Sequence, residues 1–525
     1  EGSFAAPSET EKKLLGAERL AQGIRLACFL EAVPDGKINA LQQEADGDET
    51  ICVSTPSAPS VARAASMSPA PPPERASAAQ PSEHTSAAPS AEAAPGARIY
   101  RYLGAAVDIG TTTIAAVLYR EGRAVGTMGA WNPQSVFGAD VISRMEASLE
   151  GKADKLAAIV REAVSRLLTE LAEHAGESAE VIETVIITGN TSMLYFLTKR
   201  NPRCLSRAPF EADDLFGWWT IGEALDLSCR KADVYLPRCM SAFVGADITT
   251  AILGSGLTET DCIPGADGSR KEAAAAIDTN VSCGEMDGVS AARSGRSRLM
   301  VDVGTNGEIV LFHKERLICC ATAAGPAFEG AGLSCGMRGV AGAIDHVNWE
   351  NGSWKVHVIG DREASTAEGI CGSGVIDGVA GLLESGLLED TGYLEEDVCF
   401  AGNVGLTAED IREVQLAKGA IRAGMETLLA EEKMDAAGLE GLYVAGGFGS
   451  YMSAQSAERI GLFPKIDLSR IKICGNAALA GAVKILHDRR MEKEATALAE
   501  RAKTINLGTS AKFQEFYMEY MMFEE

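Results

Sequence analysis

Basic residues are scarce in this 525-residue sequence, which has 48 Lys and Arg against 73 Asp and Glu and a net charge of −25. Proteins that coat nucleic acid or dock on anionic lipid need clustered cations, so we expect neither partner. No apolar run reaches the roughly 18 residues of a transmembrane helix, and no signal segment opens the chain. We therefore expect no membrane association.

Several short motifs are also lacking. The 13 cysteines are an odd number spread thinly over the chain, unlike a secreted disulfide scaffold, so we expect a reducing cytoplasm. No C-x-x-C pair is present, which argues against a zinc site. The sequence has neither a G-x-x-x-x-G-K-[ST] loop nor a G-x-G-x-x-G turn that opens a helix after a strand. A nucleotide would therefore need a different phosphate-binding motif.

Composition divides the chain into segments. Residues 53–97 hold half of the 18 prolines among Ala and Ser, which predicts a disordered linker. Residues 258–298 are rich in Gly, Asp, Ser and Ala without an apolar period, which predicts a polar surface insertion. The remaining sequence, with 46% hydrophobic residues overall and 55 glycines, can form large cores. We expect one lobe at 98–257 and a second at 299–525.

Short apolar runs alternate with helical periods in both expected lobes, which is typical of an α/β architecture. The run Val107–Thr111 (Val-Asp-Ile-Gly-Thr) leads into a strand, a charged turn and another strand, and Val301–Thr305 (Val-Asp-Val-Gly-Thr) does the same. In each half an apolar-striped helix then precedes a buried strand that ends in a glycine turn. The repeated order predicts a duplicated, two-lobed α/β fold.

The two Asp-x-Gly-Thr turns indicate phosphate chemistry. Gly110 and Gly304 allow a tight turn and a close approach of backbone N–H groups to a phosphate. Asp108 and Asp302, at the strand ends, are placed to hold Mg²⁺ through water. One such turn is weak evidence, but two facing copies would form an ATP clamp. The expected ATP-binding residues, including a glycine turn packed on the adenosine, are Gly110, Thr111, Thr112, Thr113, Gly304, Thr305, Asn306, Gly307, Gly446, Gly447, Phe448 and Gly449.

This set of motifs resembles the superfamily of acetate and sugar kinases, heat-shock chaperones and actin, the ASKHA fold. Four runs, at 301–309, 322–330, 334–338 and 369–374, resemble those of RACo-type reductive activators of corrinoid proteins. The resemblance implies an ATPase that drives a corrinoid cobalt from Co(II) to Co(I). It also implies an N-terminal [2Fe-2S] domain as the electron source, an external low-potential donor, a corrinoid protein partner and a homodimer.

The N-terminal residues resemble the end of a plant-type ferredoxin. In the run Gly23–Cys28, Cys28 would be the last cluster ligand, and that fold takes three more ligands from a C-x4-C-x2-C-like loop upstream. Those three are not in this sequence. We therefore expect residues 1–52 to be a remnant of a [2Fe-2S] domain in a truncated chain, with the cluster only in a longer parent protein. The alternative is that Cys28 is a plain buried thiol in a helical leader.

Two further carboxylates are candidates for catalysis. Asp247 stands at an expected helix start, and Glu329 stands in a Gly-Pro-Ala-Phe-Glu-Gly turn. Either could orient the water that attacks the γ-phosphate. Their plainer roles are a helix N-cap for Asp247 and a structural turn for Glu329.

Two other functions stay open on the residues alone. A small-molecule kinase would use Asp247 as its catalytic carboxylate, and a chaperone or filament-type protein would use nucleotide to control partner binding. The ferredoxin-like tail favours the activator, because neither rival needs an electron source.

Overall fold

A computed structural model describes residues 103–259, 296–360, 362–446 and 452–523. They belong to one compact unit, Ser90–Glu525. The expected cluster-domain remnant at 1–52 and the expected linker at 53–97 lie outside the described residues. Most of the expected polar insertion at 258–298 also lies outside them.

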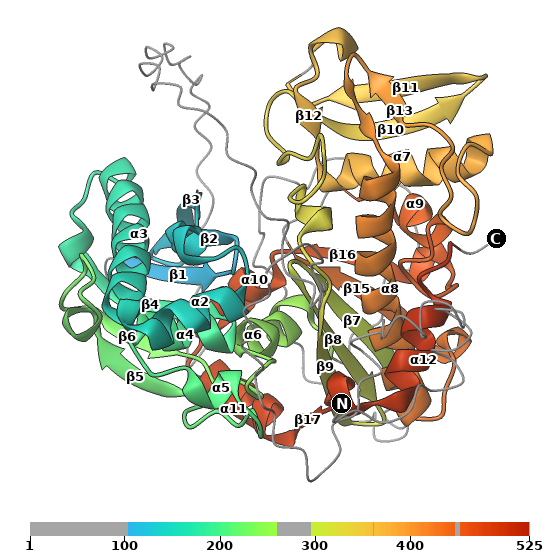
Figure 1. Cartoon of the computed structure of the whole chain (residues 1–525). Helices are drawn as coiled ribbons and strands as arrows, with labels where there is room; N and C mark the ends of the chain where they lie inside the picture. The colour runs from blue at the N-terminus through green and yellow to red at the C-terminus, as the bar shows by residue number, and fades with distance from the viewer. Residues whose placement is uncertain (1–102, 260–295, 361, 447–451, 524–525) are drawn as a thin grey trace, which may run out of the picture. The chain divides into compact units, whose positions relative to one another are not determined.

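The first lobe is built on a six-stranded sheet in the order β3-β2-β1-β4-β6-β5 (Figure 1). Its strands are β1 (Leu103–Ile109), β2 (Thr113–Arg120), β3 (Arg123–Trp131), β4 (Ile182–Gly189), β5 (Trp218–Ile221) and β6 (Asp233–Leu236). Strand β1 pairs antiparallel with β2 and parallel with β4, which in turn runs parallel to β6. The expected strand, glycine hairpin and two further strands are confirmed here.

The helices of this lobe are α2 (Val141–Ala147), α3 (Ala153–His174), α4 (Thr191–Leu197), α5 (Arg203–Ser206) and α6 (Ala246–Ser255). The longest of them, α3, covers the sheet because its apolar residues recur at helical spacing. On α3 the predicted stripe is buried at Leu156, Val160, Val164 and Leu167. Helix α3 packs on β2 and β3 with this face.

The second lobe repeats the pattern, so the duplication is confirmed. Its sheet has the order β16-β15-β7-β8-β9-β17. The strands are β7 (Ser297–Val303), β8 (Asn306–His313), β9 (Arg316–Ala323), β15 (Gly441–Ala445), β16 (Ile471–Gly475) and β17 (Lys503–Thr504). Strand β7 pairs antiparallel with β8 and parallel with β15, as β1 does with β2 and β4.

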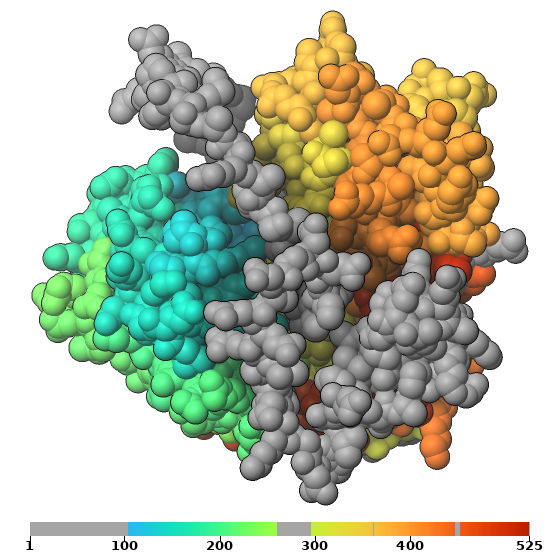
Figure 2. Space-filling view, in the orientation of Figure 1, coloured from blue at the N-terminus to red at the C-terminus, as the bar shows by residue number. Residues whose placement is uncertain are grey.

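The second lobe also carries an extra layer between β9 and α8, which makes its copy of the repeat longer. The layer contains β10 (Ala343–Glu350), β11 (Ser353–Val358), β12 (Gly369–Ile370), α7 (Gly372–Ser385), β13 (Val398–Ala401) and β14 (Val404–Leu406). Figure 2 shows its yellow and orange surface. Helix α7 packs on β10.

The remaining helices follow this layer. They are α8 (Ala408–Glu431), α9 (Ala454–Arg459), α10 (Ala477–His487), α11 (Arg490–Arg501) and α12 (Ala511–Glu519). Helix α8 begins with a capping box formed by Thr407 and Asp410, and it packs on β8, β9 and α12. None of the helices in the described ranges is both long and apolar enough to span a bilayer.

Helices α6 and α10 join the two lobes by crossing at glycines. A Cβ at Gly254 would lie 2.0 Å from the carbonyl oxygen of Ala477, and one at Gly481 would lie 1.8 Å from that of Thr250. Neither position therefore has room for a side chain. One hydrophobic cluster around this crossing takes residues from both sheets, such as Ile186 of β4 and Met300 of β7. The crossing thus fixes the sheet ends that carry the two glycine hairpins.

Candidate nucleotide site

A pocket of about 550 Å³ lies where the two glycine hairpins face each other. Its volume is in the range of small-molecule sites. Most of the predicted site residues line it: Asp108, Gly110, Thr111, Thr112, Thr113, Asp247, Asp302, Gly304, Thr305, Asn306, Glu329 and Gly446. The structure therefore brings both halves of the predicted clamp to one place.

Gly307 is placed differently, because it is buried under α8 and does not line the pocket. A Cβ there would lie 2.8 Å from Cγ1 of Ile421, so close packing of β8 on α8 accounts for this glycine. The other predicted site residues lie outside the described part of the chain: Gly447, Phe448, Gly449 and Cys28.

The first hairpin turns at Gly110, just after Asp108 at the end of β1. The Gly110 N–H donates to the carbonyl oxygen of Thr113 at 2.9 Å, and a Cβ at Gly110 would lie 2.9 Å from that same oxygen. The turn therefore excludes a side chain. Asn132 Nδ2 donates to the Gly110 carbonyl at 2.8 Å and holds the turn from the end of β3.

A buried arginine supports this hairpin from behind, and sequence patterns gave no signal for it. Arg144 on α2 is 1% exposed and donates to the carbonyl oxygens of Thr111 at 2.7 Å and Gly138 at 2.9 Å. Burial lowers its pKa to about 10, while the charges of Asp140 and Glu329 oppose that shift. Its positive charge thus lies next to the first turn without facing the pocket.

The second hairpin turns at Gly304, whose N–H donates to the carbonyl oxygen of Asn306 at 3.1 Å. Gly446, at the end of β15, lies against this hairpin with φ of 100°. A Cβ at Gly446 would lie 2.7 Å from the carbonyl oxygen of Val303 and 2.8 Å from Oδ1 of Asp302. Gly446 is therefore required both by its left-handed backbone and by its close approach to Asp302.

Asp247 lies in the first turn of α6, but it is not the N-cap. Gly245 is the cap, and Asp247 Oδ1 instead accepts the Ile248 N–H at 2.8 Å. Asp247 therefore does not have the plainer role of an N-cap. Burial raises the pKa of Asp247 to about 8, and the charges of Asp108 and Asp302 add to this shift. The carboxyl group can therefore gain or lose a proton near neutral pH.

The pocket floor gathers further carboxylates with raised pKa values. Burial raises the pKa of Asp108 to about 6, against the lowering effect of a hydrogen bond from Asn476. Burial also raises the pKa of Asp302 to about 7, with contributions from the charges of Asp108 and Glu329. These groups repel one another, so a bound cation would stabilise their ionised forms.

Glu308 is a site residue that the sequence analysis missed. It lies on β8 directly opposite Asp302 in the antiparallel pairing with β7, it lines the pocket, and it is 7% exposed. Burial, followed by the charges of Asp247 and Asp302, holds its pKa well above the usual value. In the first lobe the residue opposite Asp108 is Ala115, so the acid is specific to the second hairpin. The available signal was an acidic residue inside an otherwise apolar strand.

Glu329 connects the two hairpins. It ends the short 3-10 helix η6 (Ala327–Glu329), and its carboxylate accepts the Thr305 N–H at 3.1 Å and the Thr305 hydroxyl at 2.8 Å. It also accepts the Thr112 hydroxyl of the other lobe at 2.6 Å. The two threonine oxygens lie 3.1 Å apart. Glu329 is therefore more than a residue of a local turn.

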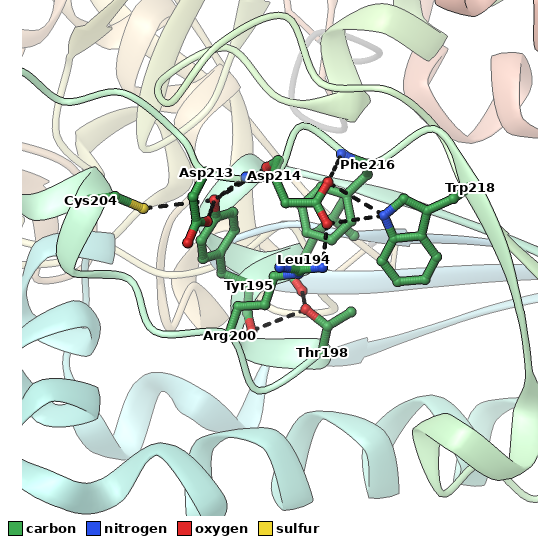
Figure 3. A network of polar contacts seen from close by, with 9 residues as sticks. All are labelled: Leu194, Tyr195, Thr198, Arg200, Cys204, Asp213, Asp214, Phe216 and Trp218. Carbon is green, nitrogen blue, oxygen red and sulfur yellow. Dashed lines mark hydrogen bonds and ion pairs between the residues drawn. The ribbon is translucent and has the colours of Figure 1, made fainter.

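A polar network (Figure 3) fixes helix α4. The N-cap of this helix, Asn190, lines the pocket. The hydroxyl of the fully buried Tyr195 donates to Asp213 and accepts the Asp214 N–H at 3.0 Å. Burial and the Asp213 hydrogen bond hold the pKa of Tyr195 above its usual value. Asp214 also accepts the indole N–H of Trp218 at 3.1 Å. The network thus anchors the end of α4 that lies away from the pocket.

The extra layer of the second lobe supplies the far wall of the pocket. A bulge between Ile344 and His346 places an additional residue, Asp345, on this side of β10, where its Oδ1 lies 2.5 Å from Nδ1 of His357. Arg338 contacts the indole ring of Trp131 across the pocket. Arg338 ends the 334–338 run of the sequence analysis, whereas Asp345, His357 and Trp131 come from parts of the sequence without a recognised motif.

The donor set suits Mg²⁺, a hard cation that prefers carboxylate and water oxygens. Asp108 and Asp302 occupy equivalent strand ends, and Glu308 lies opposite Asp302. Within the described ranges, no three His, Cys, Asp or Glu side chains form a group that could hold a metal ion by themselves.

Comparison with known proteins identifies the family. Residues 103–260 match a family model described as the RACo middle region, and residues 296–525 match one described as the C-terminal, ASKHA domain of RACo. The chain is 31% identical over 458 residues to the corrinoid activation enzyme RamQ of Eubacterium limosum, which covers 80% of this chain and 70% of that protein. The chain belongs to the RACo family. The predicted resemblance and the predicted ASKHA fold are thereby confirmed.

Two other matches agree with this membership. Over 243 residues the chain is 33% identical to the Co(II) methylated amine-specific corrinoid protein reductase of Methanosarcina barkeri, covering 42% of this chain and 45% of that protein. A solved structure of a reductive activator for corrinoid, iron-sulfur protein superposes with a TM-score of 0.69 at 30% identity, over 81% of this chain and 66% of that one. The chain thus spans about half to two thirds of the length of these two proteins.

Proposed function

We propose that this chain is an ATP-hydrolysing redox activator that drives the cobalt of a corrinoid protein from Co(II) to Co(I). The observation that carries the proposal is the pair of glycine hairpins facing one pocket in a member of the RACo family. The named relatives act on corrinoid proteins. This membership favours an activator over a small-molecule kinase or a chaperone.

One electron must reach the cobalt, and ATP hydrolysis moves none. We therefore assign ATP a conformational role, in which the nucleotide stabilises the arrangement of activator and corrinoid protein that permits reduction. The electron comes from an external low-potential donor. A [2Fe-2S] domain with Cys28 as one ligand would relay it. A homodimer and a cytoplasmic location belong to the same proposal.

The nucleotide would bind together with Mg²⁺. Apart from Arg338, the charged side chains that line the pocket are acidic, and a triphosphate alone would be repelled by them. We assign Asp108 and Asp302, with Glu308, to hold Mg²⁺ through water, where the cation neutralises phosphate charge. The hairpin residues Thr111, Thr112, Thr113, Thr305 and Asn306 would donate to phosphate oxygens. Gly110 and Gly304 would let the phosphate approach the two turns closely, and Gly446 would adjoin the adenosine.

Asp247 is the better candidate to orient the attacking water. Its pKa of about 8 lies near working pH, and its Oδ2 has no hydrogen bond among those described. Glu329 is occupied by three donors from the two hairpins. Removal of a positioned acid–base group typically costs 10²–10⁴-fold in rate.

The test uses the full chain, a candidate corrinoid protein in its Co(II) form and Ti(III) citrate as reductant. The paramagnetic signal of Co(II) is followed with Mg²⁺–ATP, with Mg²⁺–ADP and without nucleotide. Faster loss of the signal with ATP supports the function. Binding of ATP without any effect on the cobalt of several corrinoid proteins would instead favour the kinase or chaperone alternatives.

A further inference from the structure

The Glu329 carboxylate holds the donors that a phosphate would need. Its Oε1 accepts the backbone N–H of Thr305, and its Oε2 accepts the hydroxyls of Thr305 and Thr112. Each of these three donors has a single hydrogen. A phosphate oxygen at the same place cannot be bonded by them while the carboxylate stays there.

The amides of the two turn glycines do not replace these donors. The Gly304 N–H is bonded to the carbonyl oxygen of Asn306, and the Gly110 N–H to that of Thr113. Both bonds close the hairpins themselves. The Thr305 amide is thus the donor in the second turn that points to an anion, and Glu329 is that anion.

The bond pattern also crosses between the lobes. Thr112 belongs to the first hairpin, whereas Thr305 and Glu329 belong to the second lobe, so the carboxylate and the two hydroxyls tie the hairpins together across the pocket. Hydrogen bonds to a charged carboxylate contribute more stabilising free energy than hydrogen bonds between neutral groups. The same contact therefore competes with phosphate and couples the lobes.

We propose that Glu329 is an internal phosphate mimic that bound nucleotide must displace. Holding the three donors, the carboxylate lowers the affinity of the site for nucleotide and keeps the hairpins together. When a nucleotide binds, its phosphate takes the place of the Glu329 carboxylate and makes the same contacts across the lobes. The Glu329 side chain is thereby released from Thr112 and Thr305. Glu329 is then a positioning residue that sets nucleotide affinity. The inference rests on the proposed ATP site.

The test measures binding of Mg²⁺–AMP-PNP to the full chain by titration calorimetry. Glu329→Gln removes the charge, and Glu329→Ala removes the competing group. Both should bind the analogue at least about tenfold more tightly, because phosphate then no longer competes with a charged acceptor for the same donors. The matched control is Asp345→Asn, which removes one negative charge from the same pocket without touching the hairpin donors. Its affinity should change much less.

Hydrogen exchange of the Thr305 amide gives a second measure that does not depend on affinity. Without nucleotide, exchange should be faster in Glu329→Ala than in the parent, and AMP-PNP should protect both equally. If the parent binds AMP-PNP but the Glu329 variants bind it equally or more weakly, the proposal that Glu329 mimics phosphate is wrong. If Asp345→Asn gains as much affinity as the Glu329 variants, general charge repulsion explains the gain, and the proposal is also wrong. If no form binds nucleotide, the proposed ATP site itself fails.

Discussion

The side-chain amide of Asn476 donates a 2.8 Å hydrogen bond to Oδ2 of Asp108. Its oxygen accepts the Leu479 N–H at 2.7 Å, so the same residue is the N-cap of α10. One side chain thus starts the helix that joins the lobes and holds the acid of the first hairpin. The position of α10 and the ionisation of Asp108 are therefore linked.

Two substitutions separate these roles of Asn476. Asn476→Ser keeps a good N-cap but loses the reach to Asp108, whereas Asn476→Ala loses both and should cost about 1 kcal/mol of unfolding free energy. The hydrogen bond from Asn476 lowers the pKa of Asp108, so its loss should raise that pKa. Both variants should therefore shift the acid limb of ATP turnover to higher pH. Chemical denaturation and a pH–rate profile measure the two effects. An unmoved acid limb in both variants would show that Asn476 acts only as a cap.

Asp247 and Asp302 should differ in which step they affect. Asp247→Asn should lower ATP turnover by about 10²–10⁴-fold while AMP-PNP binding changes little, because the group acts on the attacking water. Asp302→Ala should instead lose Mg²⁺-dependent nucleotide binding and, with it, hydrolysis. Calorimetry and a phosphate-release assay distinguish the two patterns. Turnover of ATP by Asp302→Ala at the parental rate would show that the second hairpin has been assigned the wrong role.

The hairpins could be predicted from sequence because their requirements are local. A glycine after a strand-end aspartate, followed by hydroxyl residues, fixes a turn within a few positions, and both copies fold as expected. Asn476, Arg144 and Glu308 could not be predicted in the same way. Asn476 reaches Asp108 only when α10 packs across the lobes, and Glu308 faces Asp302 only through strand register.

Asp247 shows the limit of local rules. A carboxylate at a helix start is most simply a cap, and its sequence neighbours favour that role. In the structure Gly245 is the cap, and the pKa of Asp247 is raised first by burial and then by the charges of Asp108 on β1 and Asp302 on β7. Its chemistry therefore depends on tertiary contacts. The adenosine side of the prediction, beyond Gly446, lies outside the described residues and stays a prediction.

The acidic floor of the pocket should make stability depend on pH and on Mg²⁺. Burial raises the pKa values of Asp108, Asp302 and Asp247 to about 6, 7 and 8 from a usual 3.8. The metal-free folded protein therefore keeps protons that the unfolded chain has released. The stability from these groups is fully present below about pH 4 and is lost as the pH rises through about 6 to 8.

Mg²⁺ with AMP-PNP should reverse this loss, because the cation favours the ionised carboxylates and its binding releases protons. The increase in melting temperature on adding Mg²⁺–AMP-PNP should thus grow between about pH 5.5 and 8 and level off above. Melting curves across this range, with EDTA as the metal-free control, measure it. An increase that is independent of pH would contradict the assignment of these acids to the cation.

A [2Fe-2S] cluster needs four thiolate ligands, and these 525 residues contain no ferredoxin-type cysteine loop upstream of Cys28. The nine cysteines of the described residues are free thiols, and five of them are fully or almost fully buried in the ATPase lobes: Cys229, Cys239, Cys319, Cys320 and Cys371. Burial raises the pKa of Cys319 to about 11, which disfavours the thiolate that iron requires. We therefore expect the chain to bind Mg²⁺–ATP but to assemble no stoichiometric cluster.

Anaerobic reconstitution with iron and sulfide, followed by iron analysis and visible absorption, measures cluster content. A fusion that adds a plant-type ferredoxin loop with three cysteines before Glu1 is the matched comparison, and Cys28→Ser in that fusion is its control. We expect the fusion to gain one [2Fe-2S] per chain and the Cys28→Ser form to lose it, since Cys28 would supply the fourth ligand. One cluster per chain in the unmodified 525 residues would show that its cysteines form a different iron site. A fusion whose cluster survives Cys28→Ser would show that Cys28 is the plain thiol of the alternative interpretation.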